Sequence, residues 1–327
     1  MKIALIGRTK FLLNSGEYLL KKGLNIELII TSKNADHDII TSKDFQRFAK
    51  KVNAKFFEIQ NINSEEIKQI LRKNKLDLGI SVNNPLLIKN KIINLFKFGI
   101  LNAHAGDLPK YRGNACPNWA IINNEKSIGL SIHYMVEELD AGDILLKKKF
   151  KINSKTAIKD FYEFGENEIP KMFFECIKNI EKGKMKGKKQ NEKDVLRTFP
   201  RNKIDGKIDW NKKANEIGRL IRASGTPFFG AYTYLEGSKL IIKEFEIMYP
   251  KFQFSAEPGQ VVKRNTDGSV AVACKDGFIV LREVSYKNKT KKKASEVIKT
   301  IHTRLGMDIE SEIEKINEKL DKLLKNT

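Results

Sequence analysis

Cysteines, long apolar runs and signal-like segments are scarce in this sequence, and each of these shortages excludes a class of protein or site. Its 327 residues include three cysteines, Cys116, Cys176 and Cys274, which are far apart and form no Cys-x-x-Cys pair. This spacing excludes a disulfide framework and a cysteine-based zinc site. No apolar run approaches the roughly 18 residues that a membrane-spanning helix needs, and the apolar stretch at the N-terminus is too short for a signal peptide. We therefore expect a cytoplasmic protein that makes no membrane contact and has the length of two ordinary domains.

Common phosphate-binding and hydrolytic motifs are also missing. The sequence contains no G-x-G-x-x-G loop and no Walker-type loop, which argues against a dinucleotide-dependent dehydrogenase and against a kinase. It has neither a G-x-S-x-G nucleophile elbow nor an H-E-x-x-H zinc pair. We therefore expect no metal, and any chemistry must come from other side chains.

Arginine is scarce relative to lysine. The chain carries 61 basic and 40 acidic residues, a net charge of +21, but 50 of the basic residues are lysines and 11 are arginines. Arginine is the residue that bidentate recognition of phosphates and bases favours. Residues 101–150 hold six charges of each sign and are neutral by count. The positive charge therefore indicates a lysine-rich surface more than a nucleic-acid site.

Short apolar strands alternate with amphipathic helices in the first half of the chain. The strands are predicted at Lys2–Ile6, Asn25–Ile30, Ala54–Glu58, Leu76–Ser81 and Phe98–Ala103. This spacing is typical of parallel β-α-β units and predicts an α/β fold. Alternating residues between Ile128 and Ile152 add antiparallel strands. Ligands of such sheets bind beyond the carboxyl ends of the strands.

The second half changes in character after a lysine- and glycine-rich run, Glu181–Asp194, which has no apolar periodicity and predicts a linker. Short strands separated by Gly-containing turns follow and indicate a small β-barrel. From Leu305 the apolar residues have helical spacing, as in a packing or homodimerisation helix. The expected domains are a catalytic domain at 1–182, a linker at 183–195, a barrel at 196–290 and a helical extension at 291–327.

Chemically useful side chains concentrate in one stretch. Asn102 and His104 are two residues apart on a predicted strand, so both side chains face the same side at its carboxyl end. An asparagine amide can donate to a developing oxyanion, and a histidine can hold or transfer a proton. A carboxylate such as Asp140 can orient and charge-stabilise that histidine. We expect the other three histidines, His37, His133 and His302, to be structural, and Cys116 to be a small buried residue.

These residues carry a resemblance to a known family. Asn102-x-His104, followed by Leu108-Pro109-x-Tyr111-Arg112-Gly113 and by Asp140-x-Gly142-Asp143, resembles the formyltransferases that use 10-formyltetrahydrofolate. Similarity continues in Asp205-Gly206-x-Ile208-Asp209-Trp210. The resemblance implies a Rossmann-like formyltransferase domain with an OB-like C-terminal barrel. It also implies that Asn102, His104 and Asp140 form the catalytic triplet.

The resemblance further implies a reaction and two binding regions. The amine of the acceptor attacks the formyl carbon, Asn102 and protonated His104 stabilise the oxyanion, and Asp140 supports the imidazolium and assists proton removal. The folate is expected along Ser81, Asn83, Pro85, Leu86, Leu87 and Asp140. The acceptor is expected near Asp107, Tyr111, Arg112, Asn118 and Trp119.

Two classes of enzyme within that family use different acceptor amines, and the sequence has features that bear on both. Methionyl-tRNA formyltransferases carry a Pro- and Lys-rich insertion after the second strand, whereas residues 31–40 here are short and nearly charge-balanced. Pro117-Asn118-Trp119 also resembles the amino-sugar enzymes. A nucleotide-linked amino sugar is therefore expected, with charged initiator tRNA as the alternative. A binding protein that stacks bases on Phe228, Phe229, Tyr232 and Tyr234 is a further alternative, but it would have no need of a catalytic triplet.

Overall fold

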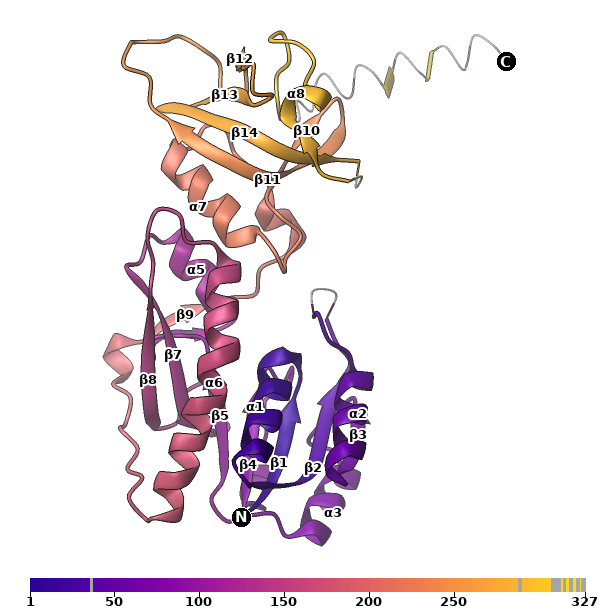
Figure 1. The fold of residues 1–327 in the computed structure, drawn as a ribbon, viewed down its shortest axis with the longest axis vertical. Helices are drawn as coiled ribbons and strands as arrows, with labels where there is room; N and C mark the ends of the chain where they lie inside the picture. The colour runs from indigo at the N-terminus through magenta and orange to yellow at the C-terminus, as the bar shows by residue number, and fades with distance from the viewer. Residues whose placement is uncertain are drawn as a thin grey trace. The chain divides into compact units, whose positions relative to one another are not determined.

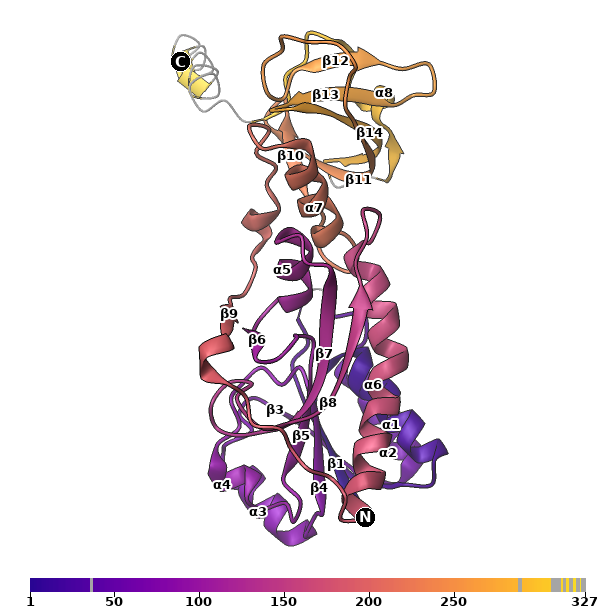
Figure 2. The same ribbon diagram turned by 90° about the vertical axis from the view of Figure 1, so that its left-hand side faces the viewer.

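The computed structural model describes residues 1–35, 38–287 and 290–306, together with Ile313, Ile316, Asn317, Leu320, Asp321 and Leu324. The chain divides into two compact units, Met1–Arg201 and Asn202–Thr327. Figure 1 and Figure 2 show the elements that make up each unit.

The first unit is built on a seven-stranded sheet. Its order is β3-β2-β1-β4-β5-β7-β8, with β1 (Lys2–Gly7), β2 (Asn25–Ser32), β3 (Lys55–Ile59), β4 (Leu78–Val82), β5 (Ile100–His104), β7 (Ser127–Tyr134) and β8 (Ile144–Lys151). The pairings from β3 to β5 are parallel, and β7 and β8 join in antiparallel fashion. This confirms the predicted Rossmann-like α/β domain.

Helices cover both faces of this sheet. Residues of α1 (Thr9–Lys21), α2 (Ser42–Val52) and α6 (Ile158–Glu181) share one apolar core with one face of the strands. Residues of α3 (Glu65–Asn74) and α4 (Asn90–Ile93) share a second core with the other face. The short helix α5 (Cys116–Ile122) follows β6 (Lys110–Gly113). Apolar strands covered on both faces are what a mostly parallel sheet requires.

A row of polar residues crosses the sheet near the carboxyl ends of its parallel strands. Ser81 on β4 is in register with Asn102 on β5, and Asn102 is in register with His133 on β7. Because Leu101 and Ala103 belong to the core beneath α1 and α6, the alternation along β5 directs Asn102 and His104 to the opposite face. The topology therefore brings polar groups of three strands to one edge.

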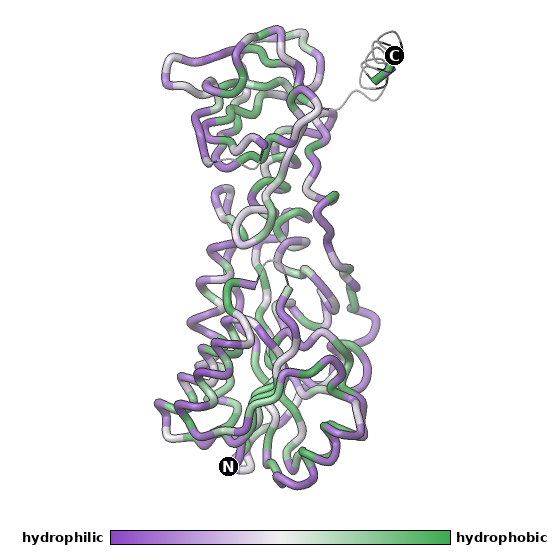
Figure 3. The backbone as a smooth tube through the Cα atoms, turned by 90° about the vertical axis from the view of Figure 1, so that its right-hand side faces the viewer, coloured by the Kyte–Doolittle hydropathy of each residue, from purple (hydrophilic) through white to green (hydrophobic). Residues whose placement is uncertain are grey.

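The second unit is a curled antiparallel sheet that forms a half-barrel. Its order is β10-β11-β14-β13-β12, with β15 paired to β14. The bounds are β10 (Tyr232–Leu235), β11 (Ser238–Met248), β12 (Val261–Arg264), β13 (Val270–Cys274), β14 (Gly277–Tyr286), β15 (Lys292–Lys293), α7 (Ala214–Ser224) and α8 (Ala294–Val297). Strands and α7 enclose one apolar core. The tube in Figure 3 shows apolar stretches along the strands of both units. The OB-like expectation is confirmed at this level.

The expected linker does not leave the first unit. Within residues 183–201, the turn η1 (Glu192–Asp194) is followed by β9 (Leu196–Thr198), which pairs in parallel with β6. The compact first unit accordingly ends at Arg201, beyond the linker expected at 183–195. The pairing of Leu196–Thr198 with β6 keeps the chain that follows the lysine-rich run within the first unit.

The helix predicted from Leu305 falls mostly on residues that are not described. Ile309 and Leu323 of that prediction lie outside the described residues, as does His37. Ile313, Ile316 and Leu320 are helical and more than half exposed. In the part of the chain that the structure describes, no helix is long and apolar enough to cross a membrane.

Candidate active site

His104 is held at the end of β5 by protein partners at both ring nitrogens. Its Nε2 atom lies 2.6 Å from the main-chain oxygen of Tyr111, and its Nδ1 atom lies 3.4 Å from a carboxylate oxygen of Asp140. A carbonyl oxygen can only accept, so Nε2 carries a proton, and the carboxylate favours a second proton on Nδ1. Burial alone would lower the pKa of this imidazole, but the Asp140 carboxylate, the Cys116 sulfur and the Tyr111 carbonyl together raise it to about 10.

Asp140 supplies the countercharge from a strained turn. Its backbone is left-handed, with φ of +53°, a conformation that non-glycine residues seldom adopt. Its carboxylate accepts a hydrogen bond from the Gly113 N–H at 2.9 Å and also lies 3.6 Å from Nε2 of His133. Burial favours the neutral acid, yet the charge of His104, the contact with His133 and the Gly113 N–H lower the pKa of Asp140 to about 2. At neutral pH the site therefore holds a buried ion pair.

His133, which the sequence predicts to be structural, contacts two of the expected site residues. Its Nδ1 atom lies 2.8 Å from the Tyr134 carbonyl oxygen, so this nitrogen donates. Its Nε2 atom lies 3.1 Å from the side-chain amide nitrogen of Asn102 and 3.6 Å from the Asp140 carboxylate. An amide nitrogen carries two hydrogens, so Asn102 can direct an N–H to a further acceptor.

Cys116 is buried, as expected, and packs beside His104. Its thiol donates to the Tyr111 carbonyl at 3.1 Å and lies 3.6 Å from His104 Nε2. Gly106 closes the other side, because a Cβ atom there would lie 2.4 Å from both His104 Nε2 and the Tyr111 oxygen. The imidazole is therefore confined by packing as well as by hydrogen bonds.

Tyr111 and Arg112 are buried and engaged with protein groups. The Tyr111 hydroxyl donates to Glu125 at 2.8 Å. The Arg112 guanidinium donates to Glu192 through both terminal nitrogens, at 3.1 and 2.7 Å, and to Gln190 through Nε at 3.0 Å. In the structure the Arg112 guanidinium therefore braces this loop through protein partners, and its contact with the acceptor stays a prediction.

The other residues expected to contact the acceptor are also placed. Asp107 is paired with Lys147 and lies 3.2 Å from Lys149. Asn118 is buried on α5. Trp119 donates from its indole nitrogen to the Phe199 carbonyl at 2.9 Å, and the Arg201 guanidinium lies over its ring. Asp107 thus lies against β8, whereas Asn118 and Trp119 belong to α5.

The segment expected to hold the folate lies at the end of β4. Ser81 is fully buried, and its hydroxyl has no hydrogen-bond partner. Asn83, Pro85, Leu86 and Leu87 follow as an exposed stretch, with Leu86 43% and Leu87 53% exposed. The helix α4 begins only at Asn90, so these residues form a loop beside the polar row.

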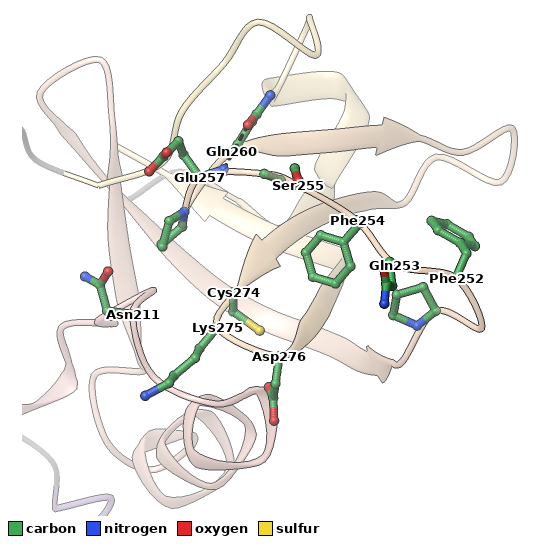
Figure 4. A pocket seen from close by; sticks show the side chains of 13 residues that line it. Asn211, Phe252, Gln253, Phe254, Ser255, Glu257, Gln260, Cys274, Lys275 and Asp276 are labelled. Carbon is green, nitrogen blue, oxygen red and sulfur yellow. Dashed lines mark hydrogen bonds between the residues drawn. The ribbon is translucent and has the colours of Figure 1, made fainter.

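A cavity of the described residues lies elsewhere, within the second unit. It has a volume of about 1210 Å³ and is walled by the loop from Pro250 to Pro258, by Asn211 and by the turn Cys274–Asp276 (Figure 4). None of the residues expected in the site lines it. Among the described residues, no cluster of three His, Cys, Asp or Glu side chains could hold a metal ion.

Two family models match the chain. One, described as formyl transferase, covers residues 1–177, and the other, described as formyl transferase, C-terminal domain, covers residues 201–302. The first alone spans more than half of the chain and contains Asn102, His104, His133 and Asp140.

Individual relatives extend the likeness over both units. The methionyl-tRNA formyltransferase of Fusobacterium nucleatum is 29% identical over 94% of this chain and 99% of its own length. That of Finegoldia magna is 31% identical over 91% of this chain and 96% of its own length. The structure of an N-formyltransferase from Helicobacter canadensis, in complex with folinic acid and dTDP-3-aminofucose, has a TM-score of 0.65 at 21% identity. It covers 86% of this chain and 98% of its own.

Domain matches, full-length relatives and fold agree. The chain belongs to the formyl transferase family and is a folate-dependent one-carbon transferase.

Proposed function

We propose that this chain transfers the formyl group of 10-formyltetrahydrofolate to the amine of a nucleotide-linked amino sugar, in the cytoplasm. The observation that carries the transfer chemistry is the buried His104–Asp140 ion pair beside Asn102. The three side chains converge at the carboxyl edge of the sheet, where α/β folds bind ligands.

Each member of the site has a distinct role in this proposal. Asn102 directs an amide N–H to the place where negative charge develops on the transferred carbonyl oxygen. His104 contributes positive charge at that place, held by Asp140. Because the pKa of Asp140 is lowered to about 2, its carboxylate is ionised at neutral pH and acts as the countercharge of His104. The proton that the amine gives up would pass to the folate nitrogen that loses the formyl group, so that the transfer leaves no net proton in the site. His133 orients Asn102.

The loop after β4 has the groups that a folate needs. When bound, 10-formyltetrahydrofolate supplies an activated one-carbon unit. The unpartnered hydroxyl of Ser81 offers a buried polar group at the end of β4, and Leu86 and Leu87 offer exposed apolar surface in the loop that follows. A flat heterocycle with polar edges requires this combination. Asn83 and Pro85 would complete the wall of that subsite.

The composition of the segment after β2 in the first unit supports a small acceptor, because it contains no basic insertion. The connection from β2 to α2 comprises residues 33–41, which carry one lysine and two aspartates. A polyanion would find no basic insertion here. The similar structure from Helicobacter canadensis contains dTDP-3-aminofucose, which is consistent with an acceptor of that class.

Charged initiator tRNA is the second candidate, and one observation favours it. The relatives named methionyl-tRNA formyltransferase align with this chain over 91% and 94% of its length, both units included. The charge excess also extends to both units: 37 basic and 23 acidic residues in Met1–Arg201, a net of +14, and 24 basic and 17 acidic in Asn202–Thr327, a net of +7.

A panel assay decides between the two. The full chain is incubated with 10-formyltetrahydrofolate and, separately, with dTDP-, UDP- and GDP-amino sugars and with charged initiator tRNA, and a His104→Asn chain serves as the blank. We expect formylation of an amino sugar with a shallow salt dependence, because a nucleotide sugar carries few phosphates. Formylation of the RNA alone, lost steeply with added salt, would reverse the ranking. No formylation of any acceptor would overturn the proposal.

A further inference from the structure

The lysine-rich segment after α6 returns to the candidate active site. Lys188 and Ile144 exchange two main-chain hydrogen bonds, at 2.8 and 2.9 Å. Further on, β9 pairs with β6, and the Thr198 hydroxyl donates to the Arg112 carbonyl at 3.3 Å. Residues 188–198, which we name the return segment, therefore lie against both loops that shape the His104–Asp140 pair.

Gln190 is the residue of the return segment that reaches the Asp140 turn. Its amide nitrogen donates to the main-chain oxygens of Asp140 and Gly142, each at 2.7 Å. Its amide oxygen accepts from Arg112 Nε at 3.0 Å. Carbonyl groups only accept and a guanidinium only donates, so the chemistry of its partners fixes the orientation of this amide.

The Arg112 guanidinium in turn fixes the position of the Gln190 side chain. The guanidinium is 2% exposed, and the two hydrogen bonds to Glu192 described above anchor it to the return segment. Paired N–H···O bonds of this kind fix direction as well as distance. The next residue, Gly113, supplies the N–H that binds the Asp140 carboxylate. One connected network thus holds both the backbone and the side chain of Asp140.

We infer that Gln190 is a positioning residue: through the carbonyls of Asp140 and Gly142 it keeps the left-handed Asp140 turn closed, so that the carboxylate stays against His104. The inference rests on the proposed function only in taking that pair as part of the catalytic site. Without the two donors, the turn loses two of the hydrogen bonds that offset its backbone strain and can relax. The carboxylate then moves away from the imidazole.

Gln190→Met tests this, because methionine keeps the side-chain length and removes the hydrogen bonds. The matched control is Lys189→Met, at the exposed neighbouring position. The charge state of His104 is followed in the full chain by NMR of labelled imidazoles, of which there are four. We expect the pKa of His104 to fall by at least about one unit in Gln190→Met and to stay at the parent value in Lys189→Met.

Kinetics supply the second readout. We expect kcat to fall about 10- to 100-fold in Gln190→Met with KM for the folate little changed, because a displaced catalytic group costs rate more than binding. A His104 titration and a kcat equal to those of the parent would overturn the inference. Should Gln190→Met not fold, slow exchange of the Gln190 side-chain amide hydrogens in the parent is the expected result, and rapid exchange would overturn it.

The two proposals fail separately. The imidazole titration needs no acceptor and no folate, so it tests Gln190 even if no formyl transfer is found. Conversely, formyl transfer with an unaltered His104 titration in Gln190→Met would leave the proposed function standing and remove Gln190 from it.

Discussion

The carboxylate of Asp140 lies 3.4 Å from His104 Nδ1, and each of the two residues is only 8% exposed. A buried charge is tolerated when it is paired and hydrogen-bonded, and both partners meet that condition through Gly113 and Tyr111. The pair is therefore preformed, and in the proposed reaction it would require no reorganisation.

Replacing Asp140 by asparagine should remove the countercharge while leaving an oxygen to accept from Gly113. We expect kcat to fall about 100- to 1000-fold, with an unchanged circular dichroism spectrum. Glu137→Gln also turns a carboxylate into an amide three residues away, at an exposed position, and should stay within about threefold of the parent, as surface changes usually do. Equal losses of kcat in the two variants would show that a disturbed turn, and not the loss of the His104–Asp140 pair, lowers the rate.

The pH dependence of stability gives a second prediction. The pKa of His104 is raised from 6.5 to about 10, so its stabilising contribution is complete below pH 6.5 and is lost as pH rises through 10. The pKa of Asp140 is lowered from 3.8 to about 2, so its contribution is complete above pH 3.8 and is lost as pH falls through 2. The pair therefore stabilises the fold most between these two ranges.

Urea unfolding of the parent and of His104→Asn measures this contribution. We expect the difference in free energy of unfolding to be larger at about pH 5 than at about pH 9. Asp140 is ionised at both values, so it adds no slope of its own. Parallel pH dependences of the two chains would contradict a charged His104.

Local patterns in the sequence predicted the parts of the site that one strand controls. The strand predicted at Phe98–Ala103 is observed at Ile100–His104, and alternation along it is enough to place Asn102 and His104 on one face. The loop at Ser81–Leu87 is likewise at the end of its strand. These features depend on a few consecutive residues, which is what periodicity reports.

The sequence did not predict the contacts of His133 and Gln190, because these contacts join residues that are far apart along the chain. His133 meets Asn102 only because β7 pairs antiparallel with β5, and a lone histidine in an alternating strand carries no sign of that pairing. Gln190 lies in a lysine-rich run whose composition is typical of a solvated linker. Its one distinguishing sign is an uncharged amide followed by Asn191 and Glu192, which is too weak to predict that the chain turns back.

Ser81 offers a test in which stability and binding separate. Its buried hydroxyl has no partner, so Ser81→Ala removes an unsatisfied polar group and should leave the free energy of unfolding unchanged or slightly higher. If the hydroxyl contacts the folate, KM for 10-formyltetrahydrofolate should rise about 5- to 10-fold, which corresponds to the loss of one hydrogen bond.

The control for Ser81→Ala is Ser131→Ala, because the Ser131 hydroxyl donates to the Gly106 carbonyl at 2.8 Å. That variant should lose about 1 kcal/mol of stability. An unchanged KM in Ser81→Ala would remove this residue from the folate subsite.

Gly106→Ala tests how tightly the imidazole is confined. The added methyl group would lie 2.4 Å from His104 Nε2 and 2.4 Å from the Tyr111 carbonyl oxygen, so it must displace the ring, the loop or both. We expect the free energy of unfolding to fall by about 1–3 kcal/mol because of overpacking, and kcat to fall about 100-fold because the histidine is misplaced.

Gly225→Ala is the matched control, since a Cβ atom at that position would have its nearest neighbours at 3.8 and 3.9 Å. It should be neutral or slightly stabilising, because alanine restricts the unfolded chain. Parental kcat in a folded Gly106→Ala chain would mean that His104 can move without loss of function, and the preformed His104–Asp140 pair would then not be what sets the rate.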